Sequence, residues 1–197
     1  MYLRLSKNPH KQFLWWLLMF DSRLSRKYRV GLDAGCANMG NRRYFKTKDY
    51  IGLDPDRDLL NAGLKKNHKI KVINSTILDA PTDLSADFVQ CIQVLVNAEF
   101  IVSETIENIS RLVEMTNKEG VLIFNTGKKS QIFVDDLSNL LEKSFREVVK
   151  VEYGGSNISS KSSFIVAFLK SILMLISAKY RLSGVPQKTY FKCIGKL

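Results

Sequence analysis

Two short apolar segments, Arg29–Ala34 and Tyr50–Leu53, end in residues that strongly constrain what this chain can fold into. The first runs directly into Gly35, and the second ends at Asp54, 19 residues later. Glycine at a strand end lets the backbone approach a ligand with no Cβ in the way. An acid at the end of the next strand can accept the hydroxyls of a ribose. Either feature alone also fits an ordinary strand-to-helix turn or a helix cap, but together they favour a nucleotide-binding strand–helix–strand unit.

The rest of the chain alternates between strand-like and helix-like segments. Further strands are predicted at Lys69–Ile73, Asp87–Ile92, Val121–Phe124, Phe145–Tyr153 and Thr189–Ile194, and helices at Pro9–Ser22, Arg57–Lys65, Glu99–Asn117, Gln131–Lys143 and about 162–180. Lys118-Glu119-Gly120 is expected to stop the helix before it, with the glycine as cap. The alternation predicts an α/β protein with a mostly parallel sheet. The last two strands are expected to pair antiparallel, because the helix at about 162–180 can be an excursion between them.

The net charge of +11 is concentrated at the two ends of the chain. Residues 1–32 carry +6 and residues 155–197 carry +7, whereas residues 33–154 carry −2. A basic excess of this kind indicates an anionic partner, either a nucleic acid or a phospholipid surface. The sequence is expected to form one domain over 1–197, with a basic, apolar helical arm at 1–28 and an apolar helical insertion at 155–187 between the last two strands.

Both basic ends also contain an apolar run, 13–20 and 164–178. Neither reaches the roughly 20 residues of a membrane-spanning helix, and no signal-peptide cleavage site follows the first. The helix at about 162–180 has two interpretations: burial against the sheet, or contact with a membrane surface, where flanking cations meet anionic lipid. Trp15 and Trp16 suit such an interface. The expected location is the cytoplasm, with peripheral attachment to the inner face of the membrane.

The three cysteines, Cys36, Cys91 and Cys193, are odd in number and far apart, which indicates reduced thiols. The chain has two histidines, so a His-rich metal site is excluded, and we expect no metal.

The turn after the first strand also bears on the kind of ligand. Gly35-x-Ala37-x-x-Gly40 loosely fits the dinucleotide fingerprint, with alanine in place of the second glycine. Asp33, two residues before Gly35, argues against a dinucleotide, because its carboxylate would repel a pyrophosphate and favour a cationic ligand. A ligand with an adenosine ribose and a positive centre is S-adenosylmethionine.

Residues 29–126 resemble the class I S-adenosylmethionine-dependent methyltransferases, especially the small bacterial group called methyltransferase type 11. The first motif of that family stands here as Asp33-Ala34-Gly35-Cys36-Ala37-Asn38-Met39, with Ala37 and Met39 in place of two glycines. Asn97 stands where the fourth-strand motif usually has histidine. The resemblance implies a three-layer Rossmann-like sandwich with a seven-stranded sheet whose last strand is antiparallel.

The resemblance also implies where the cofactor binds. The expected cofactor-binding residues are Asp33, Gly35, Cys36, Ala37, Asp54, Pro55, Thr76, Ile77 and Gln93. A slipped alignment after the third strand uses Asp79 in place of Thr76.

The leading hypothesis is an S-adenosylmethionine-dependent methyltransferase that acts on a membrane-proximal or lipid-linked acceptor, such as a glycan, or on another small molecule. The alternatives are a non-catalytic binding or scaffold protein with the same fold, and an RNA methyltransferase. Nucleic acid is less favoured, because the basic ends interleave with aliphatic runs rather than with stacking aromatics. No general base is assigned. His10, in the basic N-terminal arm, has two interpretations: a base that reaches over the site, or, as favoured, a solvated histidine near a helix start. His68, between a helix and a strand, is interpreted in the second way.

Overall fold

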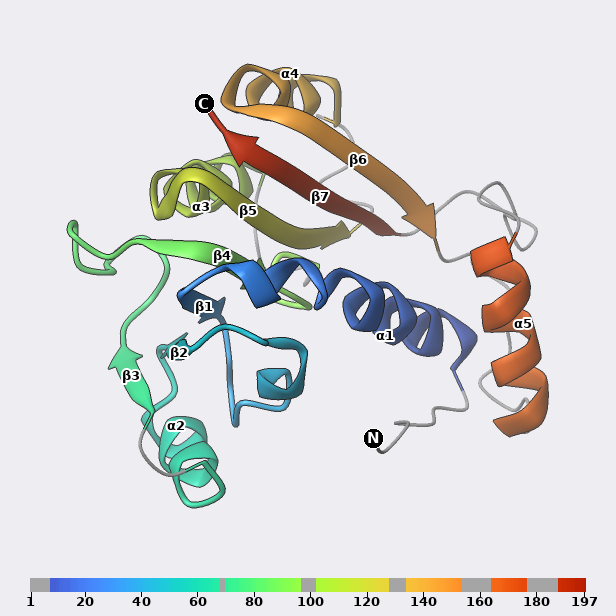
Figure 1. Ribbon diagram of the computed structural model, residues 1–197, viewed down its shortest axis with the longest axis horizontal. Helices are drawn as coiled ribbons and strands as arrows, with labels where there is room; N and C mark the ends of the chain where they lie inside the picture. Colours follow the sequence, from blue (N-terminus) through green and yellow to red (C-terminus); the bar gives the residue numbers. More distant parts are fainter. Residues whose placement is uncertain (1–7, 68–69, 97–101, 128–133, 154–163, 177–187) are drawn as a thin grey trace.

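The computed structural model describes residues 8–67, 70–96, 102–127, 134–153, 164–176 and 188–197. A seven-stranded sheet runs through them in the order β3-β2-β1-β4-β5-β7-β6 (Figure 1). The strands are β1 (Val30–Ala34), β2 (Asp49–Asp54), β3 (Lys71–Asn74), β4 (Ala86–Cys91), β5 (Thr116–Gly127), β6 (Phe145–Tyr153) and β7 (Lys188–Lys196). The helices are α1 (Pro9–Asp21), α2 (Arg57–Leu64), α3 (Val102–Glu114), α4 (Val134–Ser144) and α5 (Phe164–Ile176), with 3-10 helices η1 (Leu24–Lys27) and η2 (Arg42–Tyr44).

The pairing of the strands confirms the predicted sheet. Strands β1 to β5 are parallel to one another, and β7 pairs antiparallel with both β5 and β6. The strand order reverses direction between β1 and β4, which are adjacent. In open α/β sheets, ligands bind outside the carboxyl ends of the strands at such a switch point. The fold therefore places the ends of β1, β2 and β4 where a ligand site is expected.

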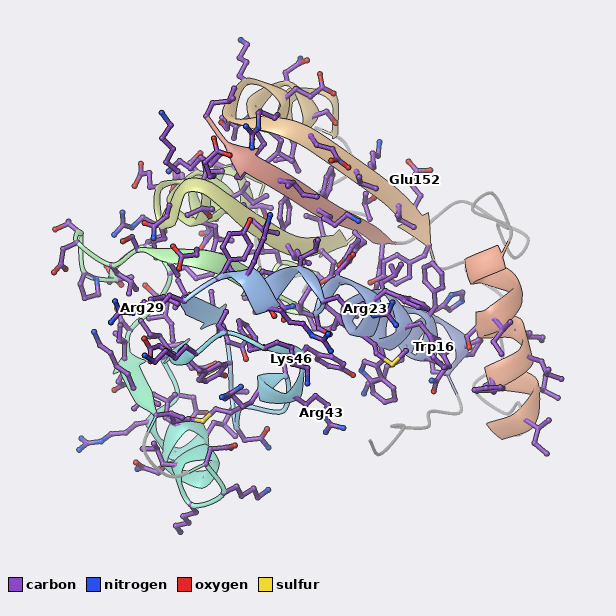
Figure 2. The ribbon with its side chains drawn as sticks, viewed as in Figure 1. Trp16, Arg23, Arg29, Arg43, Lys46 and Glu152 are labelled. Carbon is purple, nitrogen blue, oxygen red and sulfur yellow. The ribbon has the colours of Figure 1, made fainter. Side chains whose placement is uncertain are left out.

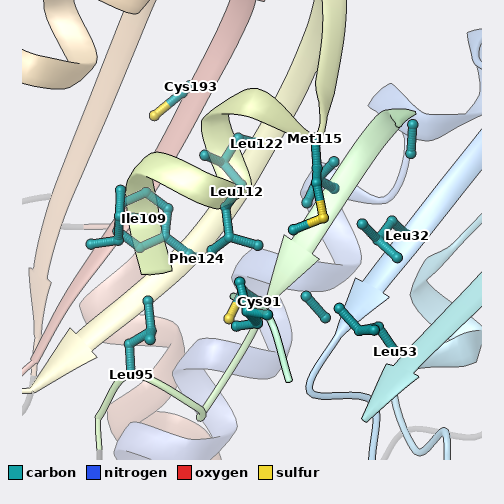
Figure 3. Packing of buried hydrophobic residues seen from close by; sticks show 14 of the residues in the cluster. Leu32, Leu53, Cys91, Leu95, Ile109, Leu112, Met115, Leu122, Phe124 and Cys193 are labelled. Atoms are coloured by element: carbon teal, nitrogen blue, oxygen red, sulfur yellow. The ribbon is translucent and has the colours of Figure 1, made fainter. Parts of the chain in front are cut away.

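Two apolar layers cover the two faces of the sheet. On one face, Ile109 and Leu112 of α3 and Leu141 of α4 pack against strand residues, as Figure 3 shows for part of this cluster. On the other face, α1 contributes Phe13, Leu14 and Leu18, α2 contributes Leu60, and the segment after β1 contributes Tyr44 and Phe45. The result is the predicted three-layer sandwich.

The crossover from β1 to β2 departs from the expected strand–helix–strand unit. It contains the 3-10 helix η2 and no α-helix. The segment has the turn-forming residues Asn38, Gly40 and Asn41, which favour turns over helix. It is held to the sheet by Phe45, whose ring packs edge-on against Tyr50 and Phe88 at centroid distances of 5.0 and 5.6 Å.

The predicted stop at Lys118-Glu119-Gly120 is wrong. Helix α3 already ends at Glu114, and these three residues lie inside β5. They form an irregular start to that strand, because the pairing with β4 jumps from Ala86↔Thr116 to Phe88↔Val121. Glu119, and not Gly120, takes the left-handed φ of 62°.

Helix α5 packs against α1, beyond the end of β6 in Figure 1. The Trp16 indole N–H donates to Ser171 Oγ at 3.2 Å, and its ring lies 5.9 Å from that of Phe168. Ala167 and Ser171 are fully buried, whereas Ile165 is 72% exposed. The interpretation of α5 as a helix buried against the sheet is thus wrong for the described residues. The rest of the predicted insertion, 155–163 and 177–187, lies outside them, as do residues 1–7 of the arm.

Candidate functional site

The loop after β1 takes a glycine-like path over the ends of β1 and β2. Gly35, Ala37 and Met39 all have left-handed φ values, 75°, 45° and 60°. These are the three positions where the resemblance expects glycine, so the backbone conformation is kept although two side chains differ. The N–H groups of Gly35 and Cys36 donate to the Leu53 carbonyl at 2.7 and 3.0 Å.

The two non-glycine side chains are accommodated in different ways. Met39 is buried, and a Cβ added to Gly63 of α2 would lie 2.8 Å from its sulfur. Cys36 is buried and packs in the same way on Gly52 of β2, with 2.9 Å to an added Cβ. Burial raises the pKa of the Cys36 thiol well above its usual range, so this cysteine is a packing residue rather than a nucleophile.

Asp54 joins the end of β2 to the loop after β1. Its Oδ2 accepts from the Ala37 N–H at 2.7 Å, and its Oδ1 accepts from the Asp56 N–H at 2.9 Å. Each carboxylate oxygen has a second lone pair that can still accept from a hydroxyl. The side chain of Asn74 donates to the Asp54 and Pro55 carbonyls at 3.1 and 2.8 Å, which holds this strand end in place.

Asp33 is fully buried, not open at the mouth of the site as the sequence suggested. The Tyr50 hydroxyl donates to its Oδ2 at 2.8 Å, and its Oδ1 has no hydrogen-bond partner among the described residues. Burial raises the pKa of Asp33 to about 7, although the Tyr50 hydrogen bond opposes this shift. A buried carboxylate oxygen without a donor fits a ligand that brings a cationic donor to it.

The turn after β3 contains the predicted adenine-contacting residues. Thr76 Oγ1 donates to Asp79 Oδ2 at 2.6 Å, so both proposed alignments of this stretch refer to one turn. The Ser75 N–H donates to the Asp54 carbonyl at 3.2 Å, which holds the turn beside the end of β2. Ile77 packs in the core, and the exposed apolar side chain of this turn is Leu78.

The segment after β4 links this loop to a second group of polar residues. A Cβ added to Gly35 would overlap a methyl carbon of Val94, which favours glycine at this position. The preceding residue, Gln93, has a left-handed φ of 66°. Its N–H donates to Asn125 Oδ1 at 2.7 Å, and its Oε1 accepts from Lys188 Nζ at 3.2 Å.

The second group lies at the ends of β5, β6 and β7. The Asn125 amide donates to the Tyr153 hydroxyl at 2.8 Å, and Tyr153 is the register partner of Lys188. The ring of Phe13 lies 5.7 Å from that of Tyr153, which brings the first turns of α1 over this group. We call Gln93, Asn125, Tyr153 and Lys188 the polar cluster.

His10 lies one helical turn before Phe13, on the same side of α1. Both of its ring nitrogens are shielded from solvent and have no hydrogen-bond partner among the described residues. Burial, followed by the charge of Lys188, lowers the pKa of His10. Its interpretation as a solvated histidine therefore does not hold, and it joins the polar cluster as a neutral imidazole.

Some of this arrangement was missed from the sequence. Asn125 and Lys188 were not singled out, although Asn125-Thr126-Gly127 is a polar end to an otherwise buried strand. Asn97 lies outside the described residues. Among the described residues, no group of three His, Cys, Asp or Glu side chains could hold a metal ion, and the three cysteines are free and buried. No described helix is long and apolar enough to cross a membrane.

A sheet of this order with an antiparallel β7 is the fold of the class I S-adenosylmethionine-dependent methyltransferases. In this chain a left-handed loop follows β1, and an acid ends β2.

Several solved structures share this fold. The N-methyltransferase NodS from Bradyrhizobium japonicum WM9, in complex with S-adenosyl-L-homocysteine, matches with a TM-score of 0.63 and 16% identity, over 95% of this chain and 88% of that one. Magnesium protoporphyrin IX methyltransferase from Synechocystis PCC 6803, with bound S-adenosylmethionine, matches with a TM-score of 0.59 and 13% identity, over 95% and 80%. The plantazolicin methyltransferase BamL matches with a TM-score of 0.57 and 13% identity, over 96% and 85%. No protein-family model and no curated protein sequence matches the chain.

Proposed function

We propose that this protein is an S-adenosylmethionine-dependent methyltransferase. The observation that carries the proposal is the hydrogen bond between the Ala37 N–H and Asp54, because it sets a ribose-accepting carboxylate against a left-handed loop. The similar structures that contain S-adenosylmethionine or its demethylated product support it. The unpartnered oxygen of Asp33 supports a cationic cofactor over a pyrophosphate.

The residues that would hold the cofactor are divided among its different parts. Asp33 would face the cationic part, the backbone of Gly35, Cys36 and Ala37 would line the adenosine, and Asp54 would accept from the ribose. Pro55, Thr76 and Ile77 would lie on the adenine side, and Gln93 would lie between the cofactor and the acceptor. When bound, the cofactor supplies an electrophilic methyl group on a positively charged sulfur. The protein's contribution is then mainly to position the acceptor in line and to exclude water.

We propose that the acceptor binds against the polar cluster and His10. A neutral imidazole without a hydrogen-bond partner can accept a proton from an acceptor hydroxyl or amine as the methyl group is transferred. Tyr153 is less suited, because burial raises the pKa of its hydroxyl despite the hydrogen bonds from Asn125 and Gln93. His10 is therefore our candidate for the general base.

The acceptor is further proposed to lie at a membrane surface, as a lipid-linked molecule such as a glycan. Helix α5 exposes Ile165 and Leu169, and α1 exposes Phe20. The guanidinium of Arg23 lies 5.7 Å from the ring of Phe20, so a cation accompanies the apolar surface. Such a surface suits attachment to anionic lipid, on the inner face of the membrane.

Calorimetry with S-adenosylmethionine tests the proposed function. Saturable binding that is lost in Asp54→Ala is the expected result. No binding at millimolar cofactor would favour the non-catalytic scaffold. The RNA methyltransferase alternative predicts RNA affinity that falls steeply with salt.

A further inference from the structure

A cavity of about 790 Å³ lies between the β1–β2 crossover and the end of α2. The crossover itself forms the short η2 and no α-helix. The polar residues of its lining come from both segments: Asn38, Arg42, Arg43, Lys46, Lys66 and Asn67. Figure 2 shows Arg43 and Lys46 on the crossover, below α1.

The lining of this cavity is strongly basic. It contains four cations and no acid. None of the four forms an ion pair with a carboxylate within the part of the chain that the structure describes. Four uncompensated positive charges around one cavity repel one another, and a polyvalent anion removes that repulsion.

Contacts on the crossover hold the two arginines in place. Arg42 Nη1 donates to the Phe45 carbonyl at 3.0 Å, and its guanidinium lies over the Tyr50 ring at 4.9 Å. Arg43 Nε donates to the Gly40 carbonyl at 3.3 Å. Each of these bonds uses one N–H of a guanidinium that has five, so donors are left for a ligand. A guanidinium held in this way is well suited to the oxygens of a phosphate.

We propose that this cavity binds a phosphorylated ligand through a diphosphate group. None of the residues proposed to bind the cofactor lines this cavity, although Asn38, Met39 and Gly40 of its lining follow Ala37 in the same loop. A diphosphate carries enough charge and enough oxygens to engage several of the four cations at once, and the amides of Asn38 and Asn67 add neutral donors. The aromatic residues of the crossover, Tyr44 and Phe45, are buried, so they give no surface for stacking nucleic acid bases.

Calorimetric titration with inorganic pyrophosphate at fixed ionic strength tests the site. The variant Arg43→Gln/Lys66→Gln removes two lining charges. The control Lys48→Gln/Lys65→Gln removes the same charge from exposed neighbours that do not line the cavity. We expect saturable binding in the wild type, weakened at least about tenfold in the lining variant and within about twofold in the control.

Phosphatidylcholine vesicles containing a lipid diphosphate form a second arm, which distinguishes a lipid headgroup from a free ligand. The site is supported if the lining variant, but not the control variant, loses binding to pyrophosphate or to the lipid diphosphate vesicles. No saturable binding of either probe overturns it, and so does equal weakening in both variants. Binding of a short RNA without binding of pyrophosphate also overturns it. S-Adenosylmethionine titrated into the same variants should bind as in wild type, so the failure of this site and the failure of the proposed function are separate results.

Discussion

The backbone N–H of Ala37 donates to Asp54 Oδ2 at 2.7 Å, although the two residues are 17 positions apart in the chain. This bond holds the loop after β1 against the end of β2, with the Leu53 carbonyl accepting from two further loop amides. The loop and the acid thus form one unit, and a change in either is expected to alter both the local structure and the binding of a nucleoside.

Asp54→Ala should lower the affinity for S-adenosylmethionine at least about tenfold, because the ribose loses a charged hydrogen-bond acceptor. It should also destabilise the fold by about 1–3 kcal/mol, since two backbone donors lose their partner. Isothermal calorimetry and urea denaturation measure the two effects. Asp56→Ala is the matched control: it removes the N-cap of α2 at about 1 kcal/mol and should leave the affinity unchanged. Unchanged affinity in Asp54→Ala would refute the proposed role.

Ala37→Gly should stabilise the protein by about 0.5–1 kcal/mol, because alanine is strained at a φ of 45° and glycine is not. Met39→Gly relieves similar strain at 60° but removes a buried side chain that packs against α2, so it should destabilise by about 2–4 kcal/mol. Urea denaturation of both variants measures the difference. Equal effects of the same sign would show that the side chain of Met39 contributes no packing.

Asp33 should make stability depend on pH. Its folded-state pKa of about 7 lies above the ordinary value of 3.8. Between these values the unfolded chain has lost the proton and the folded chain still holds it. The free energy of unfolding should therefore fall as pH rises from about 4 to about 7. Asp33→Asn should remove this part of the dependence, as measured by denaturation across that range. A variant with the same pH profile as wild type would show that Asp33 is ionised in the folded protein.

The fold was predictable because each strand and helix has its own pattern. The apolar run at Ala86–Cys91 indicates a buried strand, and the amphipathic pattern of α3 indicates a helix. The alternation of such strands and helices along the chain then predicts a parallel sheet. Gly35 and Asp54 were predictable as site residues because each lies at the carboxyl end of a strand, and the carboxyl ends of neighbouring parallel strands meet at one edge of the sheet.

The features that the sequence did not predict depend on contacts between segments that are distant in the chain. Nothing local indicates that Phe45 packs on Phe88, and this contact holds down a crossover without an α-helix. The polar cluster joins Gln93 to Lys188, 95 residues later in the chain. The first turns of α1, where His10 is shielded, lie near the end of β6 through the contact of Phe13 with Tyr153. No pattern in residues 9–21 specifies that contact.

His10 should titrate below the usual range for histidine, because burial and the charge of Lys188 both disfavour its protonated form. Nuclear magnetic resonance of labelled imidazoles measures this directly, and His68→Asn assigns the signals, since the chain has two histidines. Lys188→Gln should raise the pKa of His10 towards its ordinary value while burial keeps it below that value. Because the pKa of His10 is lower in the folded chain, the unfolded chain takes up this proton first as the pH falls. The free energy of unfolding should therefore decrease below about pH 6.5. A His10 signal that titrates as in a model peptide would remove it as a neutral general base.

The exposed apolar face of α5 should mediate attachment to anionic vesicles. Leu169 is 54% exposed on α5, and Leu59 is 38% exposed on α2. Leu169→Glu places a negative charge at the proposed lipid contact. It should strongly reduce co-sedimentation with vesicles that contain an anionic phospholipid, because it weakens both the apolar contact and the electrostatic attraction to the lipid. Leu59→Glu makes the same change on another helix and should sediment as wild type does. Similar sedimentation of the two variants, or negligible sedimentation of the wild type, would contradict a role of α5 in lipid attachment. Helix α5 would then serve only to pack against α1, where Trp16 donates to Ser171.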